Sequence, residues 1–204
     1  MRQDLLILVL VILADIVLVF EVLYFIIRRN TSNKLIQAAF ENDENKFEKV
    51  SASLGAKTLS DFDKKLIRYN VAEIRKDQVK KEELIREFEQ IELTDRQKKQ
   101  IYPKIFYHYI DRNRKQEAKE YYQKLSAFNV FSNKKDIDMT YDAYVAGGHQ
   151  YLDEALKSLK RISKQDLPAR ERLIARLYEN KGIHAEAKKY ERLAERHETE
   201  LKKR

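Results

Sequence analysis

Histidine is the side chain best suited to acid–base chemistry and metal binding at neutral pH. The chain holds four: His108, His149, His184 and His197. None of them stands at a metal-ligand spacing from a second histidine or from an acid cluster. The chain has no cysteine, which excludes a disulfide framework, Cys-ligated zinc and a thiol nucleophile. We therefore predict no metal site and no cofactor, and we expect the four histidines to be structural or solvated.

Motifs that perform catalysis are equally absent from the sequence. There is no Walker loop, no GxGxxG and no GxSxG. Asp111 and Asn113 resemble the start of a calcium loop, but the central glycine is missing and Tyr122 occupies the closing glutamate position. We therefore predict that the protein is not an enzyme and needs no small-molecule substrate.

Two acids stand out because they interrupt an apolar segment, residues 5–27. This segment has about 23 residues, or roughly 35 Å of helix, which is enough to cross a bilayer core. Asp15 lies near its midpoint, where a carboxylate costs roughly 2.5–3.5 kcal/mol. Two interpretations of Asp15 stay open: it faces a partner helix, or it is a protonated acid that the span tolerates. Glu21 can snorkel towards Arg28.

The same segment is predicted to be a retained anchor. It starts with the nearly neutral MRQD and is followed by no small-x-small cleavage site, unlike a signal peptide. Arg28, Arg29 and Lys34 follow the apolar run, so the positive-inside rule places the C-terminal domain in the cytoplasm and the N-terminus outside. The expected location is the plasma membrane. The Cys-free composition, rich in Lys, Ile and Asn, favours a bacterial source.

The rest of the chain has the composition of a helical domain. Only 4 Gly and 2 Pro occur in 204 residues, too few for a strand-and-turn architecture. The formal net charge is +8, but the two signs are closely mixed, which is typical of a solvated helix surface. Nucleic-acid binding is therefore not expected. We predict two parts: an anchor with short flanks over 1–30 and a helical domain over 31–204.

Hydrophobic periodicity predicts that the domain is a series of helix pairs. Helix starts are indicated by capping patterns at Ser60 and Thr94, by Asn133, and by Pro168 in a first turn. Gly182 and Gly147-Gly148 indicate helix ends, and Pro103 is expected to kink its helix or to mark its start near Tyr102. The predicted pairs are 31–41 with 43–54, 60–76 with 77–93, 94–112 with 114–128, 134–146 with 150–163, and 167–180 with 183–202.

The third and fifth pairs resemble the tetratricopeptide repeat (TPR) family, in which large residues on one helix pack against an alanine and an aromatic on the next. The alanines Ala118, Ala155 and Ala187 are 37 and 32 residues apart, around the 34-residue period of that family. Glu191 and Asp142 depart from the pattern. The resemblance is best over residues 95–195 and is only architectural over 31–93. The residues that carry it are Tyr102, Ile105, Phe106, Tyr109, Asn113, Ala118, Tyr122 and Leu125, then Ile174, Ala175, Tyr178, Gly182, Ala187 and Ala194.

This resemblance implies an all-α fold: a single transmembrane helix followed by a TPR-like α-solenoid of about five antiparallel hairpins. It also implies a concave groove lined by the first helix of each pair. Tyr and Arg dominate protein-binding hot spots, and such a groove suits an acidic peptide. The groove residues that the resemblance implies are Lys104, Tyr107, Tyr141, Tyr144, Arg172 and Arg176.

Two functions follow as hypotheses. The first is a membrane-anchored adaptor or scaffold that recruits or positions a protein partner at the cytoplasmic face through the concave surface of the repeats. The second is a small subunit or assembly factor of an integral membrane complex, which docks through Asp15 and Glu21.

Overall fold

The computed structural model describes residues 2–128 and 133–203, with side chains from residue 10 onward. These described residues form helices and turns and no strand, so the predicted all-α class is confirmed. The chain divides into two compact units, Met1–Thr94 and Asp95–Arg204, which we call unit 1 and unit 2. Each unit is described by itself.

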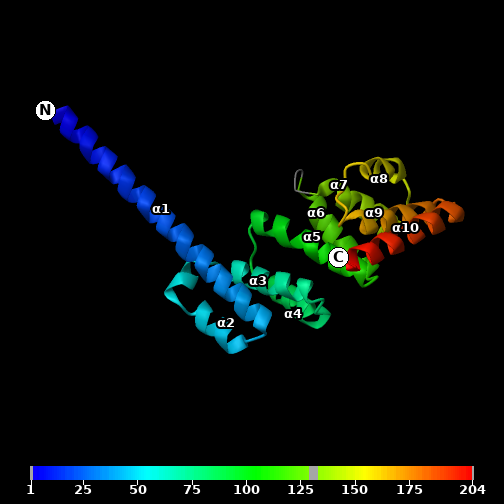
Figure 1. Ribbon diagram of the computed structural model, residues 1–204, viewed down its shortest axis with the longest axis horizontal. Helices are drawn as coiled ribbons and strands as arrows, with labels where there is room; N and C mark the ends of the chain where they lie inside the picture. Colours follow the sequence, from blue (N-terminus) through cyan, green and yellow to red (C-terminus); the bar gives the residue numbers. More distant parts are fainter. Residues whose placement is uncertain (1, 129–132, 204) are drawn as a thin grey trace. The chain divides into compact units, whose positions relative to one another are not determined.

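Unit 1 begins with α1 (Arg2–Glu41), a single uninterrupted helix of 40 residues (Figure 1). It is long and apolar enough to cross a membrane, and the side chains of its apolar part are exposed in the protein. The helix predicted separately over 31–41 is the C-terminal end of α1. There Leu35 and Ala38 are fully buried. One helix therefore contains both the apolar segment and part of the core of unit 1.

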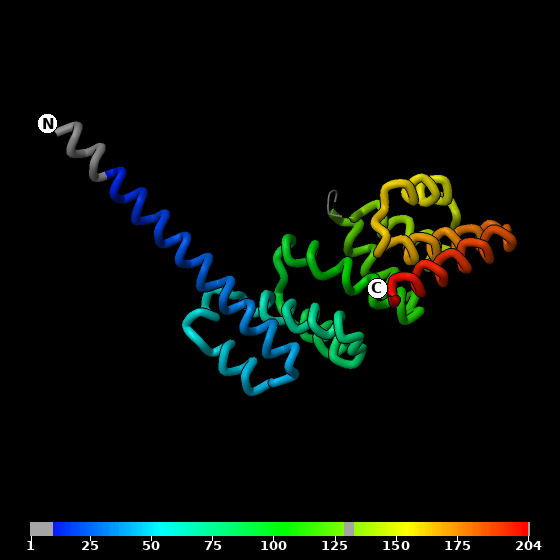
Figure 2. The backbone as a smooth tube through the Cα atoms, viewed as in Figure 1, coloured from blue at the N-terminus to red at the C-terminus, as the bar shows by residue number. Residues whose placement is uncertain are grey.

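Four short elements complete unit 1: α2 (Glu44–Ser51), the 3-10 helix η1 (Leu54–Thr58), α3 (Asp61–Ile74) and α4 (Gln78–Glu89). The tube in Figure 2 shows α2, η1 and α3 gathered around the C-terminal end of α1, in agreement with their contacts. Phe47 of α2 and Leu59, just after η1, pack on Leu35 and Ala38. The predicted capping box at the start of α3 is confirmed, since Ser60 and Asp63 each bond to the other's backbone amide.

Unit 2 consists of α5 (Asp95–Asp111), α6 (Lys115–Ser126), α7 (Lys134–Tyr141), the π-helical turn η2 (Asp142–Ala146), α8 (Leu152–Ser158), α9 (Leu167–Asn180) and α10 (His184–Lys202). The helix α5 begins at Asp95 and continues through Pro103, so the alternative start near Tyr102 is wrong. Asn133 is the N-cap residue of α7, so the predicted helix start is confirmed, but its φ is 64° and its side chain makes no cap hydrogen bond. Pro168 stands in the first turn of α9, as predicted.

Packing within unit 2 follows the predicted helix pairs in part. α5 packs on α6 and α9 packs on α10, whereas α8 packs mainly on α9. α8 is also shorter than predicted, because turns occupy the residues after Ser158. The core of unit 2 combines residues from four elements, and Ala118 of α6 is fully buried as well. That core is Met139, Ala143, Leu152, Ala155, Leu173, Ile174 and Leu177.

Candidate partner-binding site

A cleft of about 580 Å³ opens on the surface of unit 2. One wall comes from α9 and the other from α10, and Tyr144 of η2 stands at its edge. The α9 residues are spaced by three and four, and so are those of α10, which places each set on one helical face. The lining residues are Tyr144, Arg172, Ala175, Arg176, Glu179, His184, Ala187, Lys188 and Glu191.

Two alanines explain why the surface is hollow here. Ala175 on α9 is 5 % exposed and Ala187 on α10 is half-buried, and both line the cleft. A methyl group at each position leaves the space that a larger side chain would fill. Ala194, about two turns further along nearly the same face of α10, is fully buried and closes the contact between the two helices. The alanine at 187 therefore shapes the cleft, while the one at 194 serves helix packing.

The cleft carries both signs of charge with an excess of cations. Arg172 donates to Glu198, and this bond raises the pKa of the Arg172 guanidinium and lowers the pKa of the Glu198 carboxyl. Arg176 donates through Nη1 to Glu179 at 2.7 Å. Among the described residues, the buried Nε of Arg176 has no hydrogen-bond partner. Both arginines of the cleft are therefore already paired with glutamates, which an incoming carboxylate would have to replace.

Tyr144 adds an aromatic group with a polar tip to the cleft edge. Burial raises the pKa of its hydroxyl, and the nearby carboxylate of Glu191 raises it further. The hydroxyl is therefore protonated at neutral pH and available as a donor. A half-buried tyrosine beside arginines is the composition expected of a protein-binding hot spot.

The position of Tyr144 depends on the π-helical turn η2. Asp142 is 4 % exposed, and its carboxylate accepts from the amide of Tyr151 at 3.5 Å, beyond the turn. Asn180 of α9 donates from Nδ2 to the carbonyls of Ala143 and Gly148, both at 2.8 Å. These bonds hold η2 against α9. The buried carboxylate of Asp142 serves the turn as an acceptor, which gives a physical reason for an acid at this position.

Three of the six predicted groove residues, Tyr144, Arg172 and Arg176, come together in this cleft. The other three lie elsewhere in unit 2. Tyr141 ends α7 and stacks on Tyr122 of α6, with ring centroids 3.8 Å apart. Lys104 is half-buried on α5.

Tyr107 is half-buried on α5, like the other two residues outside the cleft. Burial raises its pKa to about 12, even though a hydrogen bond with Thr140 of α7 acts in the opposite direction. Its hydroxyl is bonded to α7 and does not line the cleft. Of the six predicted groove residues, the cleft in the C-terminal part of the chain therefore contains three.

The helix α10 supplies residues that the sequence analysis did not assign to the site. The repeat pattern places only first-helix residues in a groove, so it passed over His184, Lys188 and Glu191. The sequence signal for these residues was the spacing of 184, 187, 188 and 191. It places the charges of Lys188 and Glu191 beside Ala187 on a single helical face.

His108 and His197 both lie in helices of unit 2. His108 is 1 % exposed in α5. His197 of α10 contacts the buried Glu171 of α9 through Nδ1 at 2.8 Å. This contact joins the two helices on a side away from the residues that line the cleft.

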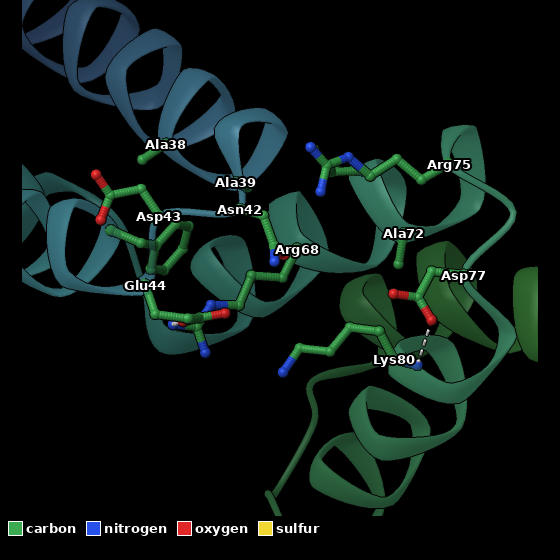
Figure 3. Close-up of a pocket in the computed structure, with 12 residues that line it drawn as sticks. Ala38, Ala39, Asn42, Asp43, Glu44, Arg68, Ala72, Arg75, Asp77 and Lys80 are labelled. Atoms are coloured by element: carbon green, nitrogen blue, oxygen red, sulfur yellow. Dashed lines mark hydrogen bonds and ion pairs between the residues drawn. The ribbon is translucent and has the colours of Figure 1, made fainter.

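A second hollow, in unit 1, is too small for a ligand. Figure 3 shows that it lies between the end of α1 and the helices α2, α3 and α4. Its volume of about 30 Å³ matches a single water molecule. Arg68 at its wall is already engaged, with Nη2 donating to Glu44 and Glu48 at 2.8 Å and the guanidinium over the ring of Phe47.

The two acids of the apolar segment differ from all of these groups. Asp15 and Glu21 are exposed on α1, in the part of the helix that no other described element covers. They lie on different faces, since six residues correspond to about 120° around a helix with 3.6 residues per turn.

Comparison with known proteins gives no family assignment for the chain. No family model matches the chain, and neither a curated protein nor a solved structure shows significant similarity to it.

Proposed function

We propose that the protein is a membrane-anchored helical adaptor that recruits or positions a protein partner at the cytoplasmic face of the plasma membrane. The cleft between α9 and α10, with Tyr144, Arg172 and Arg176, is the observation that carries this proposal. It combines area, an aromatic group and arginines in one concavity, as binding hot spots do. The anchor is α1, and its cationic C-terminal flank favours the orientation with both units in the cytoplasm.

The partner's chemistry follows from the cleft's charges. Three permanent cations, Arg172, Arg176 and Lys188, line it against two acids. An acidic peptide segment would displace Glu179 and Glu198 from the two guanidinium groups and pair with these groups in their place. We therefore propose a protein partner with an exposed acidic segment. The repeat-like pairs α5–α6 and α9–α10 would act as a rigid support for this surface.

Crosslinking from the cleft tests this function. The chain has no cysteine, so Lys188→Cys gives a single attachment point for a photoreactive group on the full-length protein in nanodiscs. Incubated with cytosol from its own cells, this protein should capture a discrete soluble protein. The double variant R172Q/R176Q should reduce capture roughly tenfold or more, as loss of two hot-spot arginines does.

The matched control is R192Q/R196Q, which removes the same charge with the same spacing from exposed positions outside the cleft. Ala187→Met should also block capture by filling the cleft, whereas Ala185→Met on the exposed side of α10 should not. If both double variants reduce capture equally, the interaction is general charge attraction and the cleft is not the binding site.

The alternative function rests on a separate observation, the exposed carboxylates of Asp15 and Glu21 on an otherwise apolar helix. An acid in a bilayer gains most from a polar or cationic partner on a neighbouring helix. A small subunit docking in this way should lose a co-purified integral membrane protein on Asp15→Leu. The adaptor should keep its soluble partner in the same variant, so the two functions give different results.

A further inference from the structure

Leu54 is 81 % exposed, the most exposed large apolar side chain among the residues whose side chains are described. It begins η1, which is anchored at its other end by the buried Leu59. A single exposed leucine on a soluble surface is ordinary and calls for no explanation. The position of this one relative to α1 makes it informative.

The segment η1 packs against the end of the apolar run. The Tyr24 hydroxyl donates to the carbonyl oxygen of Thr58 at 3.3 Å. A Cβ added to Gly55 would lie 3.4 Å from Cγ2 of Ile27 and 2.4 Å from Oγ1 of Thr31. Glycine at 55 therefore permits the close approach. Residues 24, 27 and 31 are spaced by three and four, so η1 lies along one face of α1.

This contact fixes the depth of η1 in a membrane. Ile27 is the last residue of the apolar run, and Arg28 follows it. The rise from residue 24 to residue 31 is roughly 10 Å, comparable to the headgroup layer of one leaflet. If α1 spans the bilayer with its cations at the surface, η1 must lie at the boundary between hydrocarbon and headgroups. In Figures 1 and 2 the cyan loop that contains η1 reaches furthest back along α1 within unit 1.

The residues around η1 suit that boundary. Arg29 and Lys57 are exposed, and Arg28 is held by Asp63 at 3.1 Å. Cations at this depth attract anionic lipid headgroups. The apolar Leu54, with polar Ser53, Lys57 and Thr58 beside it, gives the mixed character of an interfacial segment.

We propose that η1 is a membrane-interface docking element that inserts Leu54 among the lipids of the leaflet next to unit 1. The helix α1 and η1 together would hold unit 1 in one orientation on the bilayer surface. This inference rests on the proposed anchoring role of α1, and it adds a second, non-spanning contact with lipid.

The absence of Trp from the chain allows a direct test. Leu54→Trp places one indole in η1 of the full-length protein, reconstituted in vesicles of equal parts phosphatidylcholine and phosphatidylglycerol. Phosphatidylcholine brominated near the carbonyl should quench the fluorescence of this indole roughly twofold or more, because the indole lies at the interface. Val79→Trp is the matched control, since Val79 is also in unit 1 and is 72 % exposed on α4. It should show no quenching.

Ile16→Trp reports the anchor separately, through bromines placed deep in the acyl chain. If the indole at 16 is quenched and the one at 54 behaves like that at 79, η1 does not dock and only this inference fails. If the indole at 16 is not quenched either, the anchor itself fails, and the proposed function fails with it. Quenching at 54 must also survive dilution of the protein in lipid. Quenching that disappears on dilution would mean that Leu54 reaches the lipid only when a second copy of the chain is present, and it would overturn docking by η1 of the single chain.

Discussion

At the scale of single residues, the turn after η2 is the most constrained place in unit 2. A Cβ on Gly148 would stand 2.0 Å from Oδ1 of Asp142, whose side chain is buried and bonded to the turn. By contrast, a Cβ on Gly147 would meet no atom within 4 Å, although its φ of 68° favours glycine. Two neighbouring glycines are therefore required for different physical reasons, one steric and one conformational.

We expect Gly148→Ala to destabilise unit 2 by about 1–3 kcal/mol, the usual cost of overpacking a buried site. Gly147→Ala should cost only about 1 kcal/mol, the penalty of a left-handed residue with a Cβ. Urea unfolding followed by circular dichroism measures both. Equal losses of unfolding free energy in the two variants would mean that the side chain of Asp142 moves aside without cost.

Tyr107 makes stability sensitive to alkaline pH. Its pKa is about 12 in the folded protein and about 10 in an unfolded chain. Below pH 10 both states are protonated, so the full stability is present. Between about pH 10 and 12 only the unfolded chain loses the proton, so the folded state loses about 1.4 kcal/mol per pH unit.

Tyr107→Phe should therefore flatten this alkaline loss while costing about 1 kcal/mol at pH 7 for the hydrogen bond with Thr140. Unfolding free energies at pH 7 and pH 11 give the comparison. Tyr122, whose pKa is also about 12 through burial and Asp138, should keep part of the alkaline loss in this variant. A Tyr107→Phe protein with an unchanged pH profile would contradict the assignment.

At the scale of elements, α1 is the feature with the widest consequences. Its C-terminal turns belong to the core of unit 1 through Leu35 and Ala38, and its apolar part is exposed. A truncation at residue 31 would cut this helix in the middle, so the anchor is not separable from unit 1 at that point.

Breaking α1 tests this continuity. Asn33 is exposed on the helix, so Asn33→Pro removes a backbone bond without touching the core and should cost about 3 kcal/mol or more. Asn33→Ala should be neutral or slightly stabilising. The readout is unfolding of the full-length protein in detergent. Equal stability of the two variants would show that the helix is already interrupted there.

At the scale of the whole molecule, each unit has its own hydrophobic cluster. We therefore expect residues 95–204 to fold when expressed alone, with helical circular dichroism and one cooperative melting transition. A fragment that is unfolded, or that melts without cooperativity, would show that unit 1 is required.

Topology is a second prediction at this scale. The cationic flank of α1 predicts that unit 2 lies in the cytoplasm. Lys181→Cys, at an exposed position after α9, should react with an impermeant maleimide only after the cells are opened. Labelling of intact cells would place unit 2 outside.

The helices and the apolar segment could be predicted from the sequence because their signals are local. The capping box at Ser60, Pro168 in the first turn of α9 and the near-absence of glycine each act within a few residues. The apolar run needs only length and composition to be recognised. The bounds of most helices therefore lie within a few residues of those expected.

The tertiary structure alone decided four features. The join of residues 31–41 to the apolar helix depended on the packing of Leu35 and Ala38 with Phe47 and Leu59. The turn η2 depended on Asn180, which reaches back to Ala143 and Gly148 from 32 residues or more away. The cleft at Arg172 and Arg176, and the approach of η1 to Tyr24, also join parts distant in the chain. Local patterns determine which residues are helical, but contacts between distant residues determine which surfaces remain open.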